Sequence, residues 1–125
     1  MTLESALKAW LDDKFTVPAY WLERPQGAKR CIVYRCLSPN VINEQNGLAT
    51  GIKDDIYSIT VYMDTPDEGK TIADELTAAL NGLHHTTLGG IRIQRITYNS
   101  GYDQPLYSDG GVTVYQFNRD FRINY

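Results

Sequence analysis

The feature that most constrains this fold is an alternating segment followed at once by a capped amphipathic segment. Residues 56–63, IYSITVYM, place apolar and polar side chains on opposite faces, as a strand covered on one side does. The apolar face carries Tyr57, Ile59, Val61 and Met63. We therefore expect a half-buried strand whose cover follows directly in the chain.

The segment DTPDEGKTIADELTAALNG supplies that cover. Thr65 is a good N-cap, Pro66 suits the first helical position, and Glu68 completes a predicted capping box with Thr65. Gly82 predicts the end of the helix. Its residues at helical spacing form an apolar stripe that should pack on the sheet. That stripe consists of Ile72, Ala73, Leu76, Leu80 and Leu83.

Further elements follow from the same patterns. A helix is predicted over 2–12, capped by Thr2, and strands over 19–25, 29–37, 91–98 and 112–125. Within 91–98 the apolar residues change face, which a bulge or bend near Gln94 would reconcile. Residues 99–111 are rich in turn formers and are expected to be a loop.

These elements predict one α+β domain over residues 1–125, with a mostly antiparallel, mixed β-sheet and both helices packed on one face. The length of 125 residues suits a single domain. The net charge of -3 argues against a broad basic surface for nucleic acid. The first residues do not resemble a secretory leader, and no apolar run could span a bilayer, so we expect no membrane association and a cytoplasmic start.

Catalytic and metal-binding patterns are sparse. Cys31 and Cys36 lie at odd spacing in one predicted strand, so they point to opposite faces and do not pair. His84 and His85 are adjacent, and adjacent side chains diverge. Residues 67–71, DEGKT, lack the first glycine of a phosphate-binding loop. We expect no enzyme activity, no metal and no cofactor.

Tyrosine is frequent, with nine residues. Tyrosine is favoured at protein interfaces because it combines a large contact area with a polar tip. It is equally an ordinary residue of a half-exposed sheet. Both interpretations remain open at this point.

The order of these segments resembles a known family. A short amino-terminal helix precedes PQGAKRCIVYRCLS, a long polar connection, ITVYMDTPDEGKTIADELTAALNG, a YDQP turn and a final DFRINY. This order resembles the tail terminator and tail-completion proteins of long-tailed bacteriophages, related to the minor tail protein U of lambda-like phages. The resemblance covers nearly the whole chain.

The resemblance implies a structural role in the virion. Such proteins form a homo-oligomeric ring, commonly a hexamer, on the finished tail tube, where they stop polymerisation and present the surface that joins the head. Partners would be the tail tube protein and a head-completion or connector protein. DNA would pass through without specific binding, and the ring would belong to the virion tail after assembly in the bacterial host cytoplasm. No catalytic residue is carried over.

The long connection at about 38–55, SPNVINEQNGLATGIKDD, is polar and carries turn signals at Asn46-Gly47 and Thr50-Gly51. We interpret it as a protruding hairpin-like arm. Its apolar residues are expected to meet a neighbouring subunit or the tube protein, with charged residues at the rim. The apolar set is Val41, Ile42, Leu48 and Ile52, and the rim set is Glu44, Lys53, Asp54 and Asp55.

Two other classes of function remain as alternatives. A small enzyme or ligand-binding domain could use 38–55 as a lid, with His84, His85 or Asp54 as working groups. An adaptor could bind a partner through an edge of its sheet.

Overall fold

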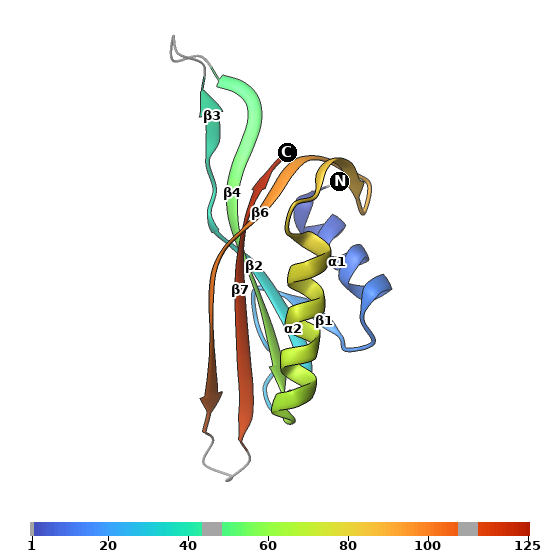
Figure 1. Ribbon diagram of the computed structural model, residues 1–125, viewed down its shortest axis with the longest axis vertical. Helices are drawn as coiled ribbons and strands as arrows, with labels where there is room; N and C mark the ends of the chain where they lie inside the picture. The colour runs from blue at the N-terminus through green and yellow to red at the C-terminus, as the bar shows by residue number, and fades with distance from the viewer. Residues whose placement is uncertain (1, 44–48, 108–112) are drawn as a thin grey trace.

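The computed structural model describes residues 2–43, 49–107 and 113–125 and confirms the α+β class (Figure 1). Within these described residues, two helices and seven strands follow one another. They are α1 (Leu3–Lys14), β1 (Ala19–Trp21), β2 (Cys31–Ser38), β3 (Val41–Asn43), β4 (Ala49–Met63), α2 (Pro66–Leu80), β5 (His84–Leu88), β6 (Ile91–Leu106) and β7 (Val114–Asn124). None of the described helices is long and apolar enough to cross a membrane.

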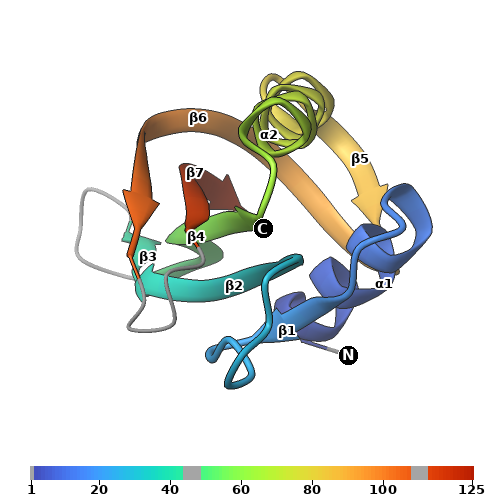
Figure 2. The same cartoon turned by 90° about the horizontal axis from the view of Figure 1, so that it is seen from below.

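The strands form one mixed sheet in the order β1-β2-β4-β7-β6-β5, with β3 paired to β4 outside this path. The β1–β2 pair is parallel, and the other pairs are antiparallel. Seen along its long axis, the sheet is strongly curled, and both helices lie on one side of it (Figure 2). We call the opposite side the outer face.

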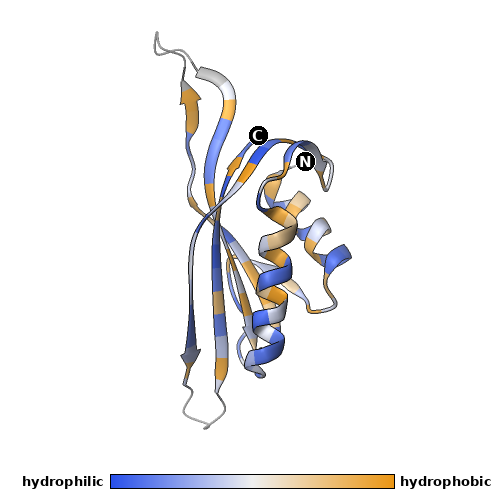
Figure 3. Ribbon diagram, viewed as in Figure 1, coloured by the Kyte–Doolittle hydropathy of each residue, from blue (hydrophilic) through white to orange (hydrophobic). Residues whose placement is uncertain are grey.

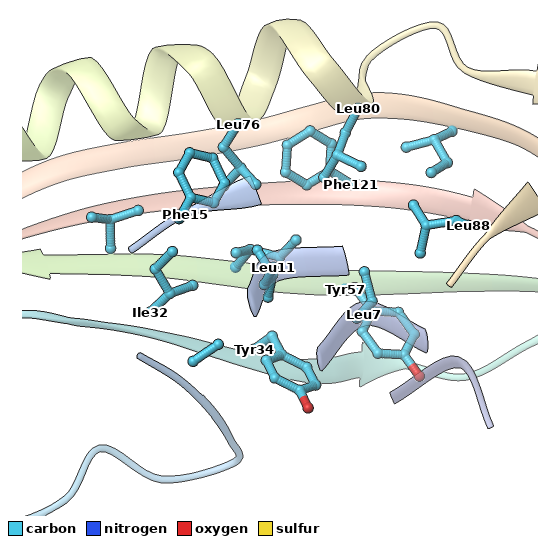
Figure 4. Close-up of a cluster of buried hydrophobic side chains, with 14 of the residues drawn as sticks. Leu7, Leu11, Phe15, Ile32, Tyr34, Tyr57, Leu76, Leu80, Leu88 and Phe121 are labelled. Carbon is cyan, nitrogen blue, oxygen red and sulfur yellow. The ribbon is translucent and has the colours of Figure 1, made fainter. Parts of the chain in front are cut away.

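The two helices close the core in different ways. Helix α2 packs across β4, β7 and β6, whereas α1 contacts β1 and β5, the two outermost strands of the path. Leu7 and Leu11 of α1 meet the same cluster as Leu76 and Leu80 of α2, over Phe121 of β7 (Figure 4). Because the curl brings both edges of the sheet to α1, a short helix suffices to complete the core.

Helix α2 begins and ends as predicted, but its predicted capping box is wrong. The Thr65 side chain makes no capping hydrogen bond. Glu68 instead accepts a hydrogen bond from Arg30, which also donates to Asp64 at 2.8 Å. A guanidinium offers Glu68 a charge-assisted partner, which is stronger than a neutral backbone N–H. Gly82, with φ 89°, ends the helix as expected.

Gly69 lets α2 approach the sheet closely. A Cβ at this position would lie 2.3 Å from the ring of Phe117. No carbon atoms can approach so closely, so the helix would have to move or the buried ring would have to rotate. The glycine in DEGKT therefore serves helix–sheet packing.

Strand β6 is twice as long as predicted. Residues 99–106, expected to be a loop, form regular pairs with β7 from Ser100↔Asp120 to Leu106↔Val114. Gly101 permits this pairing, because a Cβ there would lie 2.3 Å from the backbone oxygen of Asn118. The long alternating β7 provides a ladder that overrides the turn preferences of residues 99–106.

Of the two origins expected for the phase change in β6 near Gln94, the structure shows a bend rather than a bulge. The register shift between β6 and β7 falls between Tyr98 and Ser100. Arg95 is the residue at which β6 changes partners, since it pairs with both His84 of β5 and Asn124 of β7. Ile93 and Ile96 are both fully buried because the strand turns around the core as it passes from one neighbour to the other.

The amino-terminal strands also differ from expectation. Strand β1 ends at Trp21 rather than at residue 25, and Leu22 follows with φ 73°. Strand β5, which was not predicted, places both histidines in the sheet edge. Its five residues carry no apolar alternation, so periodicity could not reveal it.

Candidate functional site

An arm formed by β3 and residues 49–53 of β4 leaves the body of the molecule. It extends beyond both helices at one end of the long axis (Figure 1). Its pairs run from Val41↔Lys53 to Asn43↔Ala49 with a register irregularity between them. Gly51 lies there with φ 83°, a conformation that glycine adopts without strain.

This arm replaces most of the long connection expected over 38–55. Only Pro39 and Asn40 separate β2 from β3, and β4 begins at Ala49. Strand β4 extends upstream of Ile56 because Asp54 and Asp55 pair with Asn124 and Ile123 of β7. Polar residues can occupy this part of a strand because the ladder is made by the backbone.

Apolar side chains are exposed along the arm and at its base. Val41 is 54% exposed, Leu37 47% and Ile42 38%. Strand β3 accordingly stands out as an apolar segment at the edge of the molecule (Figure 3). Ile52 is half-buried, and Glu44 and Leu48 lie outside the described residues. Grouped exposed apolar side chains are a feature of contact surfaces.

Asp55 joins the arm to the body, and its predicted place at the rim is wrong. It is only 4% exposed. One carboxylate oxygen accepts the Asn40 backbone N–H at 3.0 Å, and the other accepts the Tyr125 hydroxyl at 2.7 Å. Burial, and next its hydrogen bond to Asp55, raise the pKa of Tyr125. Asp55 thus ties the β2–β3 turn to the carboxyl-terminal residue.

Asp54 points to the outer face and forms the neighbouring anchor. Its two oxygens accept from Arg122 Nε at 2.8 Å and from a terminal nitrogen of Arg122 at 2.9 Å, while Asn124 donates at 2.7 Å. The Arg122 hydrogen bond is the main cause of a lowered pKa at Asp54. This two-point pairing fixes β4 to β7 where the arm begins.

A hollow of about 970 Å³ lies where the arm meets the start of α1. Tyr57 donates from its hydroxyl to Glu4 at 2.8 Å there, and burial, then this bond, raises the Tyr57 pKa. The Lys53 ammonium lies 5.2 Å from the centre of the Tyr125 ring. The lining combines side chains of α1, β2, the arm and the carboxyl terminus. Its members include Leu3, Cys36, Val41, Gly51, Lys53 and Ile91.

The groups considered for catalysis do not converge. His84 and His85 are exposed on β5 with ring centroids 5.7 Å apart, and His84 Nδ1 lies 3.0 Å from the Gly82 carbonyl oxygen. Asp54 is held by Arg122. Across residues 2–43, 49–107 and 113–125, no group of three His, Cys, Asp or Glu side chains is arranged to hold a metal.

We call the contacts of Asp54 and Asp55 between the arm and the body the joint. The sequence did not predict that Asn40 and Tyr125 belong to it. The signal for Tyr125 was present, because it shares the face of Phe121 and Ile123 and therefore points toward the helices. Asn40 contributes its backbone N–H, so its side-chain type gave no signal.

The comparisons with known proteins follow the fold. No known protein family matches the sequence, and no curated protein matches it. Solved structures do share the architecture of a curled mixed sheet with two helices on one side. One such chain, which carries no functional name, is 16% identical, with a TM-score of 0.57 over 98% of this chain and 91% of the other.

A second solved structure comes from a particle described as the virion of a native gene transfer agent. That chain is 12% identical, with a TM-score of 0.54 over 99% of this chain and 98% of its own length. At this identity the likeness establishes a shared fold. The present chain therefore shares its fold with a chain of that particle.

Proposed function

We propose that this protein is a structural component of a phage or prophage tail. It forms a ring on the end of the tail tube, stops polymerisation of the tube and presents the surface to which the head is joined. Its partners are further copies of itself, in a ring that is most simply a hexamer, the tube protein and a head-completion or connector protein.

The observation that carries this proposal is the fold shared with the gene transfer agent virion, which extends over 99% of this chain and 98% of the other. The order of sequence segments that resembles tail terminator proteins supports the same role independently.

The shape of the molecule suits a ring. A closed ring requires two different surfaces on each subunit, because each contact is head-to-tail. The arm lies at one end of the long axis, and the β6–β7 pair reaches the other end (Figure 1). Val41 and Ile42 offer apolar contact area on the arm, while Lys53 at its base and Asp54 on the outer face offer charge.

The net charge of -3 suits a channel through which DNA passes without specific binding. Lysine and arginine contacts to phosphates create affinity, so an acidic subunit limits retention of DNA. We further propose that the protein has no enzymatic activity and no cofactor, and that it reaches the virion tail after assembly in the bacterial host cytoplasm.

Negative-stain microscopy of the purified protein, alone and with tail tubes, tests the proposal. Rings, or caps at tube ends that halt tube growth, are the expected result. Light scattering after size-exclusion chromatography gives the number of subunits. A protein that stays monomeric at all concentrations and never binds tubes would exclude the role.

One observation favours a second candidate, an adaptor that binds through a sheet edge. Among the described strands, β6 beyond Arg95 pairs only with β7, so residues 99–106 leave their other edge open. An open edge can accept a strand from a partner. Hydrogen exchange that slows at 99–106 on adding a partner, without ring formation, would favour the adaptor.

A further inference from the structure

The outer face of the sheet contains polar side chains that are buried although they do not belong to the hydrophobic core. Ser58, Thr60 and Asn118 point away from the helices, yet their exposed fractions are 2%, 7% and 5%. Polar groups on an open sheet face are normally hydrated. Here the curl of the sheet and the residues around them remove these groups from solvent.

Asn118 is the key member of this group. Its amide nitrogen lies 2.5 Å from Ser58 Oγ and 3.0 Å from Thr60 Oγ1, while its amide oxygen is buried without a hydrogen-bond partner. Hydroxyl groups can donate as well as accept, so the amide can be rotated with its oxygen toward them. In either orientation one end of the amide has no protein partner, and a buried polar group in that state is costly.

A partly open cavity of about 100 Å³ adjoins Asn118. Its polar lining consists of groups that can donate hydrogen bonds and includes no carboxylate. Two guanidinium groups belong to that lining although the protein is acidic overall. The complete lining is Leu22, Arg24, Val33, Arg35, Thr60, Tyr62, Tyr102, Gln116 and Asn118.

Neither cavity arginine has an acidic partner among the described residues. Arg24 lies over the Tyr62 ring, 4.7 Å from its centre. Burial raises the pKa of Tyr62, and the positive charges of Arg24 and Arg35 oppose this rise by a smaller amount. Both charges therefore act on the same hydroxyl. Both arginines are exposed, and an anion between two like charges beside one cavity would offset their repulsion.

From these observations we infer that the cavity between Arg24, Arg35 and Asn118 binds a small free oxyanion such as inorganic phosphate. Each guanidinium donates from two nitrogens, and the Tyr62, Tyr102 and Thr60 hydroxyls add neutral donors. With the Asn118 oxygen turned to Ser58 and Thr60, its amide N–H groups also donate to the anion. This arrangement gives every end of the Asn118 amide a partner.

Phosphate titration followed by amide NMR tests the site, with sodium chloride at equal ionic strength as the reference. Saturable shifts centred on Thr60, Tyr62 and the Asn118 side-chain NH₂ are expected, at phosphate concentrations of about 1–10 mM. Phosphate should also raise the unfolding temperature relative to chloride, because it binds the native state only.

Two variants and a matched control make the result specific. Arg35→Gln and Arg24→Gln should each weaken phosphate binding about tenfold, since each removes a charged donor. Arg92→Gln, at an exposed arginine on β6 that does not line the cavity, should leave binding unchanged. Circular dichroism of all three verifies the fold, so that lost binding is not mistaken for unfolding.

Three results would overturn the assignment. Shifts that never saturate, or that match those in chloride, would mean that no site exists. Equal weakening by Arg92→Gln would mean general screening of surface charge. Tighter binding of a DNA duplex than of phosphate at the same resonances would assign the donors to a nucleic-acid backbone. All these outcomes are independent of whether the protein forms rings.

Discussion

The body and the arm share strand β4, but its side chains have different surroundings in the two regions. Within the body, β4 buries Tyr57, Ile59, Val61 and Met63 against the helices. In the arm, residues 49–52 of the same strand are paired with β3 alone among the described strands, and the arm extends beyond both helices (Figure 1). Helical cover, rather than strand character, thus decides which part of β4 belongs to the core.

This difference separates folding from contact. Burial of an apolar side chain in the body contributes roughly 1.5–3 kcal/mol to the free energy of folding. The exposed apolar side chains of the arm contribute little to folding, so their area is available for another molecule. The joint around Asp54 and Asp55 sets the direction in which the arm is presented.

The largest expected effect comes from the core of the body. Leu76→Ala should lower the free energy of unfolding by about 2–5 kcal/mol, because it leaves a cavity in a fully buried cluster. Val41→Ala in the arm should change it by less than about 0.5 kcal/mol. Urea denaturation of both variants makes the comparison, and equal losses would show that the arm is part of the core.

A second prediction concerns the joint itself. Asp55→Ala should cost about 1–3 kcal/mol, because the Tyr125 hydroxyl and the Asn40 N–H lose their acceptor. Tyr125→Phe, which removes one of those two bonds, should cost less, about 0.5–1.5 kcal/mol. An Asp55→Ala protein as stable as the parent would mean that solvent already reaches this carboxylate.

A third, smaller effect depends on pH. Arg122 lowers the pKa of Asp54 in the native state, so the unfolded chain binds a proton more readily. The resulting stability is present above about pH 4 and is lost as the pH falls through the lowered value. Because Arg122 is exposed, solvent screens this ion pair and keeps the effect small.

Asp54→Asn should therefore show a weaker loss of unfolding free energy between neutral and acidic pH than the parent protein. Glu23→Gln, at an exposed acid without an ion pair among the described residues, serves as the control and should behave like the parent. If the unfolding free energy of Asp54→Asn falls between neutral and acidic pH as much as that of the parent protein, the Asp54–Arg122 pair does not stabilise the joint.

Some of this architecture could be predicted from sequence because local signals agreed with burial. The alternation over 56–63 and the stripe of α2 each report which face meets the core, and the apolar faces are buried there as expected. The expectation that only one face of 56–63 is covered is wrong, because Ser58 and Thr60 on the opposite face are buried as well. Thr2 caps α1 as expected, and its side chain accepts a hydrogen bond from the Ser5 backbone N–H.

Other features depend on contacts between distant segments. Residues 99–106 form a strand because they pair with β7. Glu68 accepts a hydrogen bond from Arg30 instead of completing the predicted capping box. Asp55 looked like a rim residue because charged residues are usually exposed. Its burial is set by Tyr125, a residue 70 positions along the chain. Local patterns contain no information about such partners.

Replacing residues 43–52 by Asn-Gly tests the central claim that the arm serves assembly and not folding. Val41 and Lys53 already pair across the arm, so Ile42 and the new Asn-Gly can close the shortened hairpin as a three-residue loop without disturbing the body. Two quantities are measured on one preparation: the free energy of unfolding, and ring or tube-end binding by microscopy with light scattering.

We predict a change of less than about 1 kcal/mol in unfolding free energy together with the loss of rings and of tube-end binding. A variant that unfolds, or one that still forms rings and caps tubes like the parent protein, would contradict the assignment of the arm as an assembly surface.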